Sequence, residues 1–336
     1  MNSPVKNTDL STRIFAVRQQ SFNSMALEVF RFQHQHNTVY RQYCDVLGIN
    51  AASIHTIDKI PFLPISFFKT HTIQTTAFEP EVIFESSGTT QTINSRHWVK
   101  DTGLYQRSFT TAFNLFYGNP AQWCIIALLP SYLERQHSSL VMMADELIGQ
   151  SGHPKSGFYL YDFEKLAATL QALEAAGQQT LLLGVTFALL DFAEAFPMPL
   201  QHSIIMETGG MKGRKEELTR QQVHAILNAA FSTTAIHSEY GMTELLSQAY
   251  AKEKGLFTTP PWMKVLLRAE DDPFEVKDAP EVNHSSGAIN IIDLANLYSC
   301  SFIATDDAGR LYPDGSFEVL GRLDNSDIRG CSLLAV

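Results

Sequence analysis

TLLLGVTFALLDFAEAFPMPLQHSIIM, residues 180–206, is the stretch that decides the fold. Its two ends, residues 180–184 and 202–206, are short apolar runs and predict buried strands. Between them, over residues 186–195, apolar side chains recur at helical spacing and predict a helix. A strand, a helix and a second strand in this order form the repeating unit of a parallel sheet.

The same alternation continues on both sides of this stretch. Strands are expected at 82–84, 124–129, 157–161 and 233–237, and helices at 98–116, 138–149, 163–176 and 215–230. Short apolar strands that alternate with helices predict an α/β fold, with mostly parallel sheets covered by helices and a smaller β-rich subdomain after them.

The two ends of the chain differ from this pattern. Residues 11–47 carry apolar side chains at three- and four-residue spacing and stop at Gly48, which predicts amphipathic helices. Beyond about residue 245, strands divided by Pro, Gly and Asp turns are expected at 262–268, 287–293, 300–304 and 316–320. We therefore expect an N-terminal helical cover (1–60), an α/β core (61–260), a small β-rich subdomain (261–322) and a mobile C-terminal tail (323–336).

Composition excludes several classes of function. The net charge is −10, and the short basic cluster at 212–215 is followed by two glutamates, so no nucleic-acid surface is expected. The N-terminus has no apolar core of signal-peptide length, and the apolar run at 181–192 is too short to span a bilayer. Four widely separated cysteines, Cys44, Cys124, Cys300 and Cys331, predict a reduced, cytoplasmic setting.

A loop rich in hydroxyl groups, ESSGTTQT at residues 85–92, follows the first expected strand. Hydroxyl and backbone N–H groups around a glycine can wrap a phosphate, because glycine permits close approach and the N–H dipoles face the anion. The Gly-Lys-Ser/Thr of a Walker A loop is absent. Taken alone, such a loop is more often an ordinary turn.

A second segment, SEYGMTE at residues 238–244, also follows an expected strand. Ligands in open α/β sheets collect at the carboxyl ends of strands, so both segments are expected to face one crevice. There Tyr240 could stack on a base, Thr243 could bond a phosphate oxygen and Glu244 could hold Mg²⁺. Taken alone, Glu244 is better explained as an acid in the first turn of a helix.

A third segment combines Thr305-Asp306-Asp307 with Gly321-Arg322-Leu323-Asp324. A carboxylate can accept both hydroxyls of a ribose diol, and an arginine can reach a further ribose or phosphate oxygen. The alternative for the two adjacent aspartates is a strand that ends in a turn.

In order and spacing, these segments resemble the adenylate-forming superfamily of acyl-CoA ligases, and most closely its LuxE-type acyl-protein synthetase branch. The resemblance runs from about residue 60 to the end of the chain. It implies a phosphate loop at Ser86, Ser87, Gly88, Thr89 and Thr90, an adenine-contacting turn at Gly209 and Gly210, the Tyr-Gly-x-Thr-Glu motif at Tyr240, Gly241, Thr243 and Glu244, a ribose-binding Asp307, and a hinge at Arg322 and Asp324.

The resemblance implies a two-step reaction that uses ATP and Mg²⁺. A carboxylic acid, by resemblance a fatty acid, attacks the α-phosphorus of ATP, and a nucleophile then captures the acyl-AMP. Mg²⁺ is expected on Glu244, with Thr243 and the loop hydroxyls around the phosphates. In the LuxE-type branch a cysteine near the C-terminus takes the acyl group as a thioester for delivery to an acyl reductase partner, and Cys331 matches that role. The neighbouring Arg329 could lower the pKa of this thiol.

The chain departs from the superfamily at two places. Gln91 stands where many members have a glycine, and only twelve residues follow Asp324, where ordinary ligases continue into a domain with a lysine that assists adenylation. The missing positive charge is expected from Arg322, from Lys69 or from a partner protein, and the sequence leaves these three open. Two other functions also stay open: an acyl-CoA ligase that uses coenzyme A, and a catalytically inactive nucleotide-binding scaffold in a reductase assembly.

Overall fold

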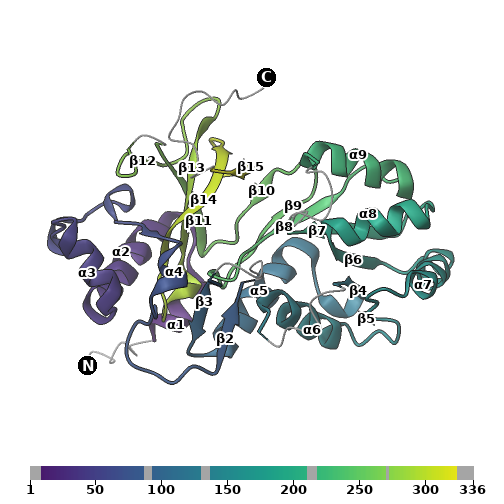
Figure 1. Ribbon diagram of the computed structural model, residues 1–336, viewed down its shortest axis with the longest axis horizontal. Coiled ribbons are helices and arrows are strands. Elements are labelled where there is room, and N and C mark those ends of the chain that lie inside the picture. The colour runs from purple at the N-terminus through teal and green to yellow at the C-terminus, as the bar shows by residue number, and fades with distance from the viewer. Residues whose placement is uncertain (1–8, 87–92, 130–136, 210–217, 270–271, 324–336) are drawn as a thin grey trace, which may run out of the picture.

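The computed structural model describes residues 9–86, 93–129, 137–209, 218–269 and 272–323 (Figure 1). Its α-helices are α1 (Leu10–Arg13), α2 (Gln19–His36), α3 (Thr38–Val46), α4 (Phe67–Thr70), α5 (Thr102–Tyr117), α6 (Ser139–Ser151), α7 (Phe163–Ala175), α8 (Thr186–Ala195) and α9 (Arg220–Phe231). Its strands are β1 (Leu63–Pro64), β2 (Val82–Glu85), β3 (Arg96–Val99), β4 (Cys124–Leu128), β5 (Gly157–Phe158), β6 (Thr180–Val185), β7 (Ser203–Thr208), β8 (His237–Tyr240), β9 (Ala249–Ala251), β10 (Phe257–Thr258), β11 (Met263–Arg268), β12 (Val276–Lys277), β13 (Ser285–Asp293), β14 (Phe302–Leu311) and β15 (Phe317–Arg322).

One large sheet contains thirteen of these strands. Its order is β12-β11-β13-β14-β15-β10-β9-β8-β7-β6-β4-β5, with β1 added beside β14. The strands β5, β4, β6, β7 and β8 pair in parallel, whereas the neighbours from β8 through β10 to β12 pair antiparallel. The predicted α/β fold class is therefore confirmed. Parallel pairing is concentrated in one half of the sheet, and the short strand β1 adds a parallel pair with β14 in the other half.

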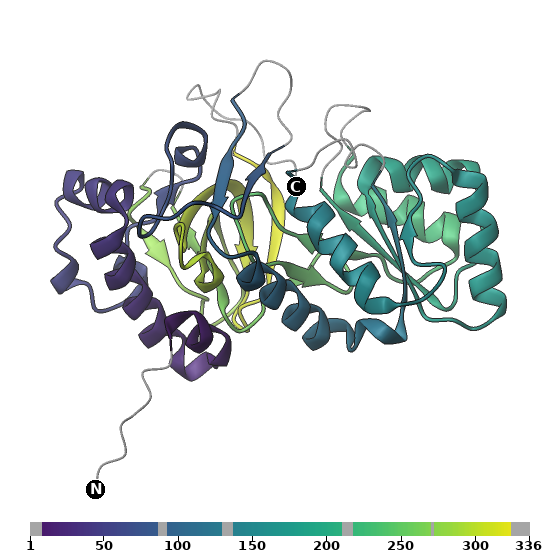
Figure 2. The same cartoon turned by 90° about the horizontal axis from the view of Figure 1, so that it is seen from below.

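Helices cover both faces of the parallel half (Figure 2). On one face α7, α8 and α9 pack together through aromatic rings: the centroid of Phe192 lies 5.6 Å from that of Phe163 and 5.9 Å from that of Phe231. The helices α5 and α6 contact each other on the opposite face. Because both faces are covered, β4 and β6 are buried along their whole length.

The antiparallel half joins the parallel half through two short strands, β9 and β10. The pairing of β10 with β15 has a single register pair, Phe257 with Phe317. The strands expected as a separate β-rich unit after residue 260 thus belong to the same sheet as the α/β core. The domain boundary at 260 stays a prediction.

The predicted start of the helix at residue 98 is wrong, because residues 96–99 form β3 and pair with β2 in a two-stranded hairpin. The helix α5 begins only at Thr102, where the side chain of Asp101 accepts a hydrogen bond from the N–H of Leu104 and caps it. The run RHWV has only four residues, too few for hydrophobic periodicity to distinguish a strand from the first turn of a helix.

The predicted strand at 233–237 is also wrong in its position. The strand β8 spans His237–Tyr240, so it runs directly into the Tyr-Gly-x-Thr-Glu segment. The strand contains two buried polar residues, Ser238 and Glu239. Glu239 has a hydrogen bond with Thr208 of β7, and Ser238 has one with His224 of α9. Hydrophobic periodicity cannot find a strand of this composition.

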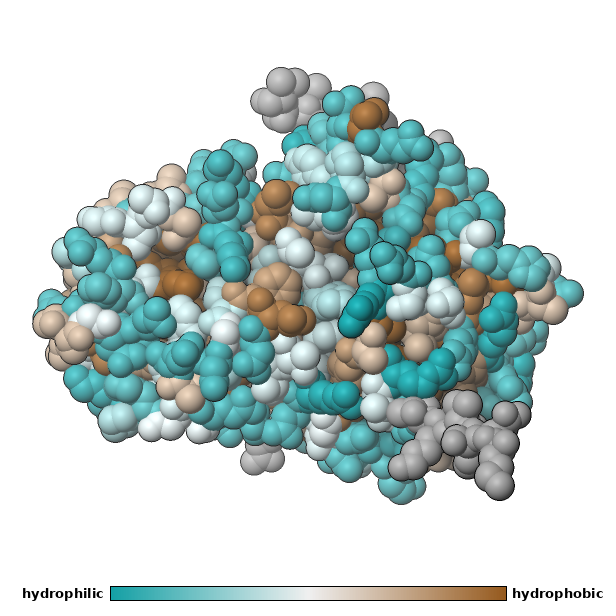
Figure 3. Space-filling model, turned by 180° about the vertical axis from the view of Figure 1, so that it is seen from behind, coloured by the Kyte–Doolittle hydropathy of each residue, from teal (hydrophilic) through white to brown (hydrophobic). Residues whose placement is uncertain are grey.

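The helices expected over residues 11–47 are confirmed and lie beside the antiparallel half (Figure 1). Tyr40 stacks on Phe302 of β14 at 6.0 Å between centroids, and Phe30 meets the same ring edge-on at 6.1 Å. Among the described residues, no helix is both long enough and apolar enough to cross a membrane. Hydrophilic residues predominate on the face shown in Figure 3, with hydrophobic residues scattered between them.

Candidate nucleotide site

The candidate site lies where β8 ends beside β14 and β15. The hydroxyl of Tyr240, the last residue of β8, donates a hydrogen bond to Oδ2 of Asp307 at 2.7 Å. Asp307 is the register partner of Arg322 across β14 and β15. The structure therefore brings together Tyr240 of the second segment with Asp307 and Arg322, which come from the two parts of the third segment.

Aromatic packing fixes the ring of Tyr240. Its centroid lies 5.5 Å from Phe317, edge-on, and 5.7 Å from Phe257. Burial raises the pKa of Asp307, and the hydrogen bond from Tyr240 and the positive charges of Arg322 and Arg220 lower it. The adjacent Asp306 also raises this pKa, and the overall shift is upward. In its ionised form the carboxylate accepts hydrogen bonds from hydroxyl groups.

Glu244 is buried, with 6% of its surface exposed. Burial raises the pKa of its carboxyl group, while a hydrogen bond from Ser95 and the charges of Lys69 and Arg322 lower it. Lys69 and Arg322, the two cations that the sequence proposed for the missing positive charge, therefore both interact electrostatically with the carboxylate of Glu244. The carboxylate of Glu244 is an oxygen donor of the kind that Mg²⁺ prefers, and Mg²⁺ is often held by one carboxylate together with substrate phosphates. Among the described residues, no group of three or more His, Cys, Asp or Glu side chains could hold a metal ion by itself.

The backbone around Glu244 is held by the segment after β13. The N–H of Leu246 donates to Asp293 Oδ2 at 3.0 Å and to Asn296 Oδ1 at 2.9 Å. The amide of Asn296 donates to the carbonyl oxygen of Glu244 at 2.7 Å. These polar side chains are buried, and burial raises the pKa of Asp293 to about 6.

Glu239 underlies the turn at Gly241 and was not predicted as a site residue. A Cβ atom on Gly241 would lie 2.5 Å from Oε1 of Glu239, so no other residue fits without displacing that carboxyl group. Thr208, at the end of β7, donates its hydroxyl to Oε2 of Glu239. Gly209, at a φ of +69°, follows directly, so Glu239 connects the predicted adenine-contacting turn to the Tyr240-Gly241 turn.

The first motif is described only at its start. Ser86 donates its backbone N–H to Ser95 at 3.0 Å, and its hydroxyl accepts the N–H of Ser95 at 2.9 Å. This reciprocal pair closes the base of the loop between β2 and β3. Ser87, Gly88, Thr89, Thr90, Gln91, Gly210, Asp324, Arg329 and Cys331 lie outside the described residues.

The sequence is similar to one protein family and to two known proteins. Residues 9–111 match the model of the family described as "Acyl-protein synthetase, LuxE". The "Long-chain-fatty-acid--luciferin-component ligase" of Aliivibrio fischeri is 25% identical over 99% of this chain and 94% of that protein. The protein of the same description from Vibrio harveyi is 23% identical over 94% of this chain and 87% of its own length.

Solved structures share the fold. A 2-hydroxyisobutyryl-CoA ligase in the postadenylation state superposes with a TM-score of 0.64 at 10% identity, over 96% of this chain and 73% of that enzyme. ATP-bound MatB from Rhodopseudomonas palustris gives a TM-score of 0.53 at 16% identity, over 74% of this chain. The match spans about half of that enzyme's length, 50%.

Proposed function

We propose that the chain is an acyl-protein synthetase of the LuxE type, which activates a carboxylic acid with ATP and transfers the acyl group from the acyl-AMP to a thiol with release of AMP. The observation that supports this function best is the hydrogen bond between Tyr240 and Asp307, which joins two separate motifs at one site. Glu244, four residues after Tyr240, adds a buried carboxylate to the same turn.

Each described residue has a role in this proposal. Asp307 accepts the ribose hydroxyls, Tyr240 orients Asp307, and Glu244 holds Mg²⁺ with the hydroxyl of Thr243 toward the phosphates. Bound ATP supplies the α-phosphoryl group that the substrate carboxylate attacks, and pyrophosphate leaves. Ser86 anchors the base of the loop that would surround the phosphates, with Ser87, Gly88, Thr89 and Thr90 as its proposed contacts and Gly209 and Gly210 at the adenine.

Positive charge for the first step comes from within the chain in this proposal. Lys69 and Arg322 both lower the pKa of Glu244, so both lie close enough to act on charge at that carboxylate. Phosphoryl transfer needs such stabilisation more than it needs covalent participation by the protein. We therefore assign Lys69 and Arg322 to the developing negative charge.

The acyl acceptor in this proposal is Cys331. Cys44, Cys124 and Cys300 are buried, and burial raises the pKa of Cys44 and of Cys300 to about 12. A thiol with a pKa so far above neutrality has almost no thiolate and is a poor nucleophile. Cys331 is the remaining cysteine of the four. The acid is proposed to be a long-chain fatty acid, and an acyl reductase the partner that receives the acyl group.

Exchange of labelled pyrophosphate into ATP tests the first step. The chain, with Mg²⁺ and a panel of carboxylic acids, should catalyse exchange with at least one acid. Glu244→Ala should lower the exchange rate by about a hundredfold or more, because it removes the proposed metal ligand, whereas the exposed Glu253→Ala should not. No exchange with any acid, alone or with a reductase, would overturn the enzyme function and favour the scaffold.

Intact mass tests the second step. After incubation with ATP, Mg²⁺ and the active acid, the wild-type chain should gain the mass of one acyl group, which hydroxylamine removes. Cys331→Ser should keep the exchange activity and lose this mass gain. Persistence of the label in Cys331→Ser would assign the acceptor to another residue. In a parallel incubation that also contains coenzyme A, release of acyl-CoA without any labelled protein would establish the coenzyme A ligase instead.

A further inference from the structure

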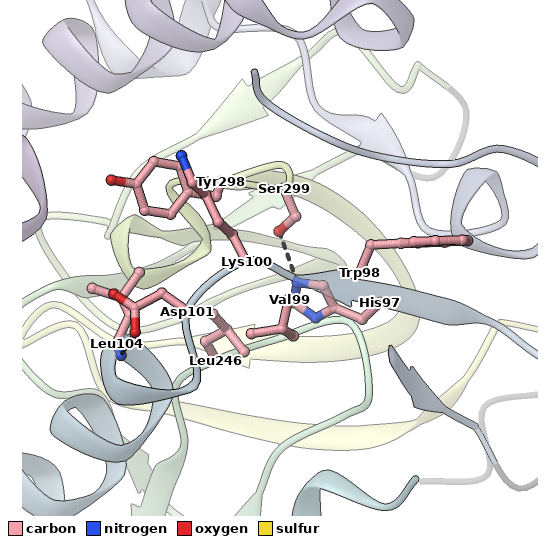
Figure 4. A pocket seen from close by; sticks show the side chains of 9 residues that line it. All are labelled: His97, Trp98, Val99, Lys100, Asp101, Leu104, Leu246, Tyr298 and Ser299. Carbon is pink, nitrogen blue, oxygen red and sulfur yellow. Dashed lines mark hydrogen bonds between the residues drawn. The ribbon is translucent and has the colours of Figure 1, made fainter. Parts of the chain in front are cut away.

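Next to the candidate site, His97 on β3 is buried between two polar partners, Thr243 and Ser299, and Figure 4 shows its hydrogen bond with Ser299. Its Nδ1 lies 2.9 Å from the carbonyl oxygen of Thr243, and its Nε2 lies 2.8 Å from Oγ of Ser299. The ring is 1% exposed. Sequence separates His97 from Thr243 by 146 residues, so the contact is a product of the fold.

The partners fix the tautomer of His97. A carbonyl oxygen can only accept, so Nδ1 carries a hydrogen and donates it to Thr243. With Nδ1 as the donor, Nε2 lies 2.8 Å from Oγ of Ser299 and can accept its hydroxyl hydrogen. A ring with one donor and one acceptor can hold the carbonyl of Thr243 and the hydroxyl of Ser299 at the same time.

We propose that His97 is a positioning residue that fixes the Thr243-Glu244 turn by holding the carbonyl of Thr243. This inference rests on the proposed function only for its effect on catalysis. Two consecutive carbonyls of the turn are then held by buried side chains, that of Thr243 by His97 and that of Glu244 by Asn296. A turn held at two adjacent peptide groups cannot rotate one of them without breaking a buried hydrogen bond.

The far side of His97 is supported by the N-terminal helices. The carbonyl oxygen of Ser299 accepts the amide of Asn37 at 2.9 Å and the hydroxyl of Thr75 at 2.6 Å. Asn37 is the N-cap of α3, where its side chain also accepts the N–H of Tyr40. A series of hydrogen bonds therefore connects α3 to the Thr243-Glu244 turn through Ser299 and His97.

The pocket that His97 lines is too small for a substrate. The pocket in Figure 4 has a volume of about 10 Å³, which is enough for roughly one water molecule. The ammonium group of Lys100 lies 4.3 Å from the centroid of the Tyr298 ring at its wall. His97 also packs edge-on against Phe68 of α4, at 5.6 Å between centroids, beside Lys69. His97 is thus part of a packed support and not of a binding pocket.

Three substitutions separate the two contacts of His97. In His97→Asn the amide nitrogen can occupy the place of Nδ1 and still donate to Thr243. In His97→Gln the side-chain amide can occupy the place of Nε2, so it keeps the hydrogen bond with Ser299 and loses the one to Thr243. His97→Leu loses both hydrogen bonds. Circular dichroism and thermal unfolding identify which variants are folded, and the exposed His202→Asn is the matched control.

Hydrogen exchange of the backbone amides in residues 240–248 is the first readout, because it needs no activity. Exchange should rise at least about tenfold in His97→Gln and His97→Leu and stay near the wild-type rate in His97→Asn, since one lost hydrogen bond changes the opening equilibrium by about that factor. Unchanged exchange in folded His97→Gln, or equal loss of protection in His97→Asn, would overturn the proposal.

Pyrophosphate exchange is the second readout. The rate at saturating MgATP should fall about tenfold or more in His97→Gln and His97→Leu and within about threefold in His97→Asn, because small displacements of catalytic groups are costly. An equal rate in all three folded variants would also overturn the proposal. If the wild-type chain has no exchange activity, the proposed function fails, while the amide measurement still decides the role of His97.

Discussion

Glu239 is a buried carboxyl group whose nearest described partners do not include a full positive counter-charge. It receives the hydroxyl of Thr208, and its register partner on β9 is Tyr250. Within the described part of the chain, the hydroxyl of Tyr250 and Oε1 of Gln248 are buried without a hydrogen-bond partner. Burial raises the pKa of Glu239 to about 7, the bond from Thr208 opposes this, and Glu207 adds to it.

The free energy of unfolding should therefore depend on pH through Glu239. Its pKa is about 7 in the folded chain against an ordinary 4.5, so the folded state binds more protons in that interval and loses stability as pH rises through it. Glu239→Gln cannot ionise, so its stability relative to wild type should improve between pH 5 and pH 8, by up to about 3 kcal/mol at roughly 1.4 kcal/mol per pKa unit.

Urea unfolding at the two pH values measures this difference. Glu253→Gln, at an exposed acid, should show no such change with pH. A stability difference between wild type and Glu239→Gln that is the same at pH 5 and pH 8 would show that Glu239 is ionised throughout.

At the scale of single residues, the sequence predicted Tyr240, Glu244, Asp307 and Arg322, because each stands in a short motif whose chemistry can be read locally. The structure brings Tyr240, Asp307 and Arg322 together, but the roles of these four residues, of Thr243 and of the phosphate loop all remain predictions. Glu239 and His97 were missed because a lone glutamate or histidine carries no local signal. Their importance depends on burial and on partners far away in the sequence.

At the scale of elements, the narrow connection through β10 is strengthened by Arg220 at the start of α9. Its Nη1 donates to the carbonyl oxygen of Val319 on β15 at 2.9 Å, and its Nε donates to Glu207 Oε1 on β7 at 3.3 Å. The guanidinium carbon lies 5.1 Å from the centroid of the Phe257 ring. One side chain thus contacts β7, β10 and β15.

Arg220→Met should lower the free energy of unfolding by about 1–3 kcal/mol, because it removes the positive charge and one of the donors at the buried carboxylate of Glu207 and the donor to the carbonyl of Val319, while keeping the packing on Phe257. Thermal or urea unfolding measures the change. Arg310→Met is the matched control: its ion pair with Glu318 is longer, at 3.6 Å, and more exposed, so it should cost less than about 1 kcal/mol. Equal effects of the two substitutions would contradict the special role of Arg220.

Most long elements could be predicted because their apolar spacing is regular. The helix α8 has the predicted bounds, 186–195, and β6 differs from its prediction by one residue. The strands β9 and β10 have three and two residues, too few for periodicity to detect. The connection between the two halves of the sheet therefore could not be foreseen. Of its flanking strands, β8 was predicted too early in the chain, and the prediction at 300–304 covers only the start of β14.

At the scale of the whole molecule, the N-terminal helices are tied to the segment that supports the candidate site. Gln33 of α2 is fully buried and donates its amide to the carbonyl oxygens of Asn296 and Leu297, each at 3.0 Å. Its Oε1 accepts the N–H of Ser301 at 2.9 Å. Residues 1–60 were predicted only as a cover, and the structure gives α2 a direct contact with the support of the Glu244 turn.

Gln33→Leu should lower the free energy of unfolding by about 2–4 kcal/mol, because it removes the hydrogen bonds to the carbonyl of Leu297 and the N–H of Ser301 and one of the donors to the carbonyl of Asn296. It should also lower pyrophosphate exchange, since Asn296 holds the carbonyl of Glu244. Unfolding and exchange assays on the purified chain measure both effects. The exposed Gln35→Leu on the same helix should change neither by more than the measurement error, and a similar loss in both variants would refute the link.

The place of β15 in the sheet has a consequence for the order in which the chain can fold during synthesis. It lies between β14 and β10, two strands that the ribosome makes before it. Until β15 has been made, the two half-sheets each carry an open edge at which another chain could pair. The same strand carries Arg322 to its place opposite Asp307. A nascent chain therefore cannot complete the candidate nucleotide site before β15 has joined its two half-sheets.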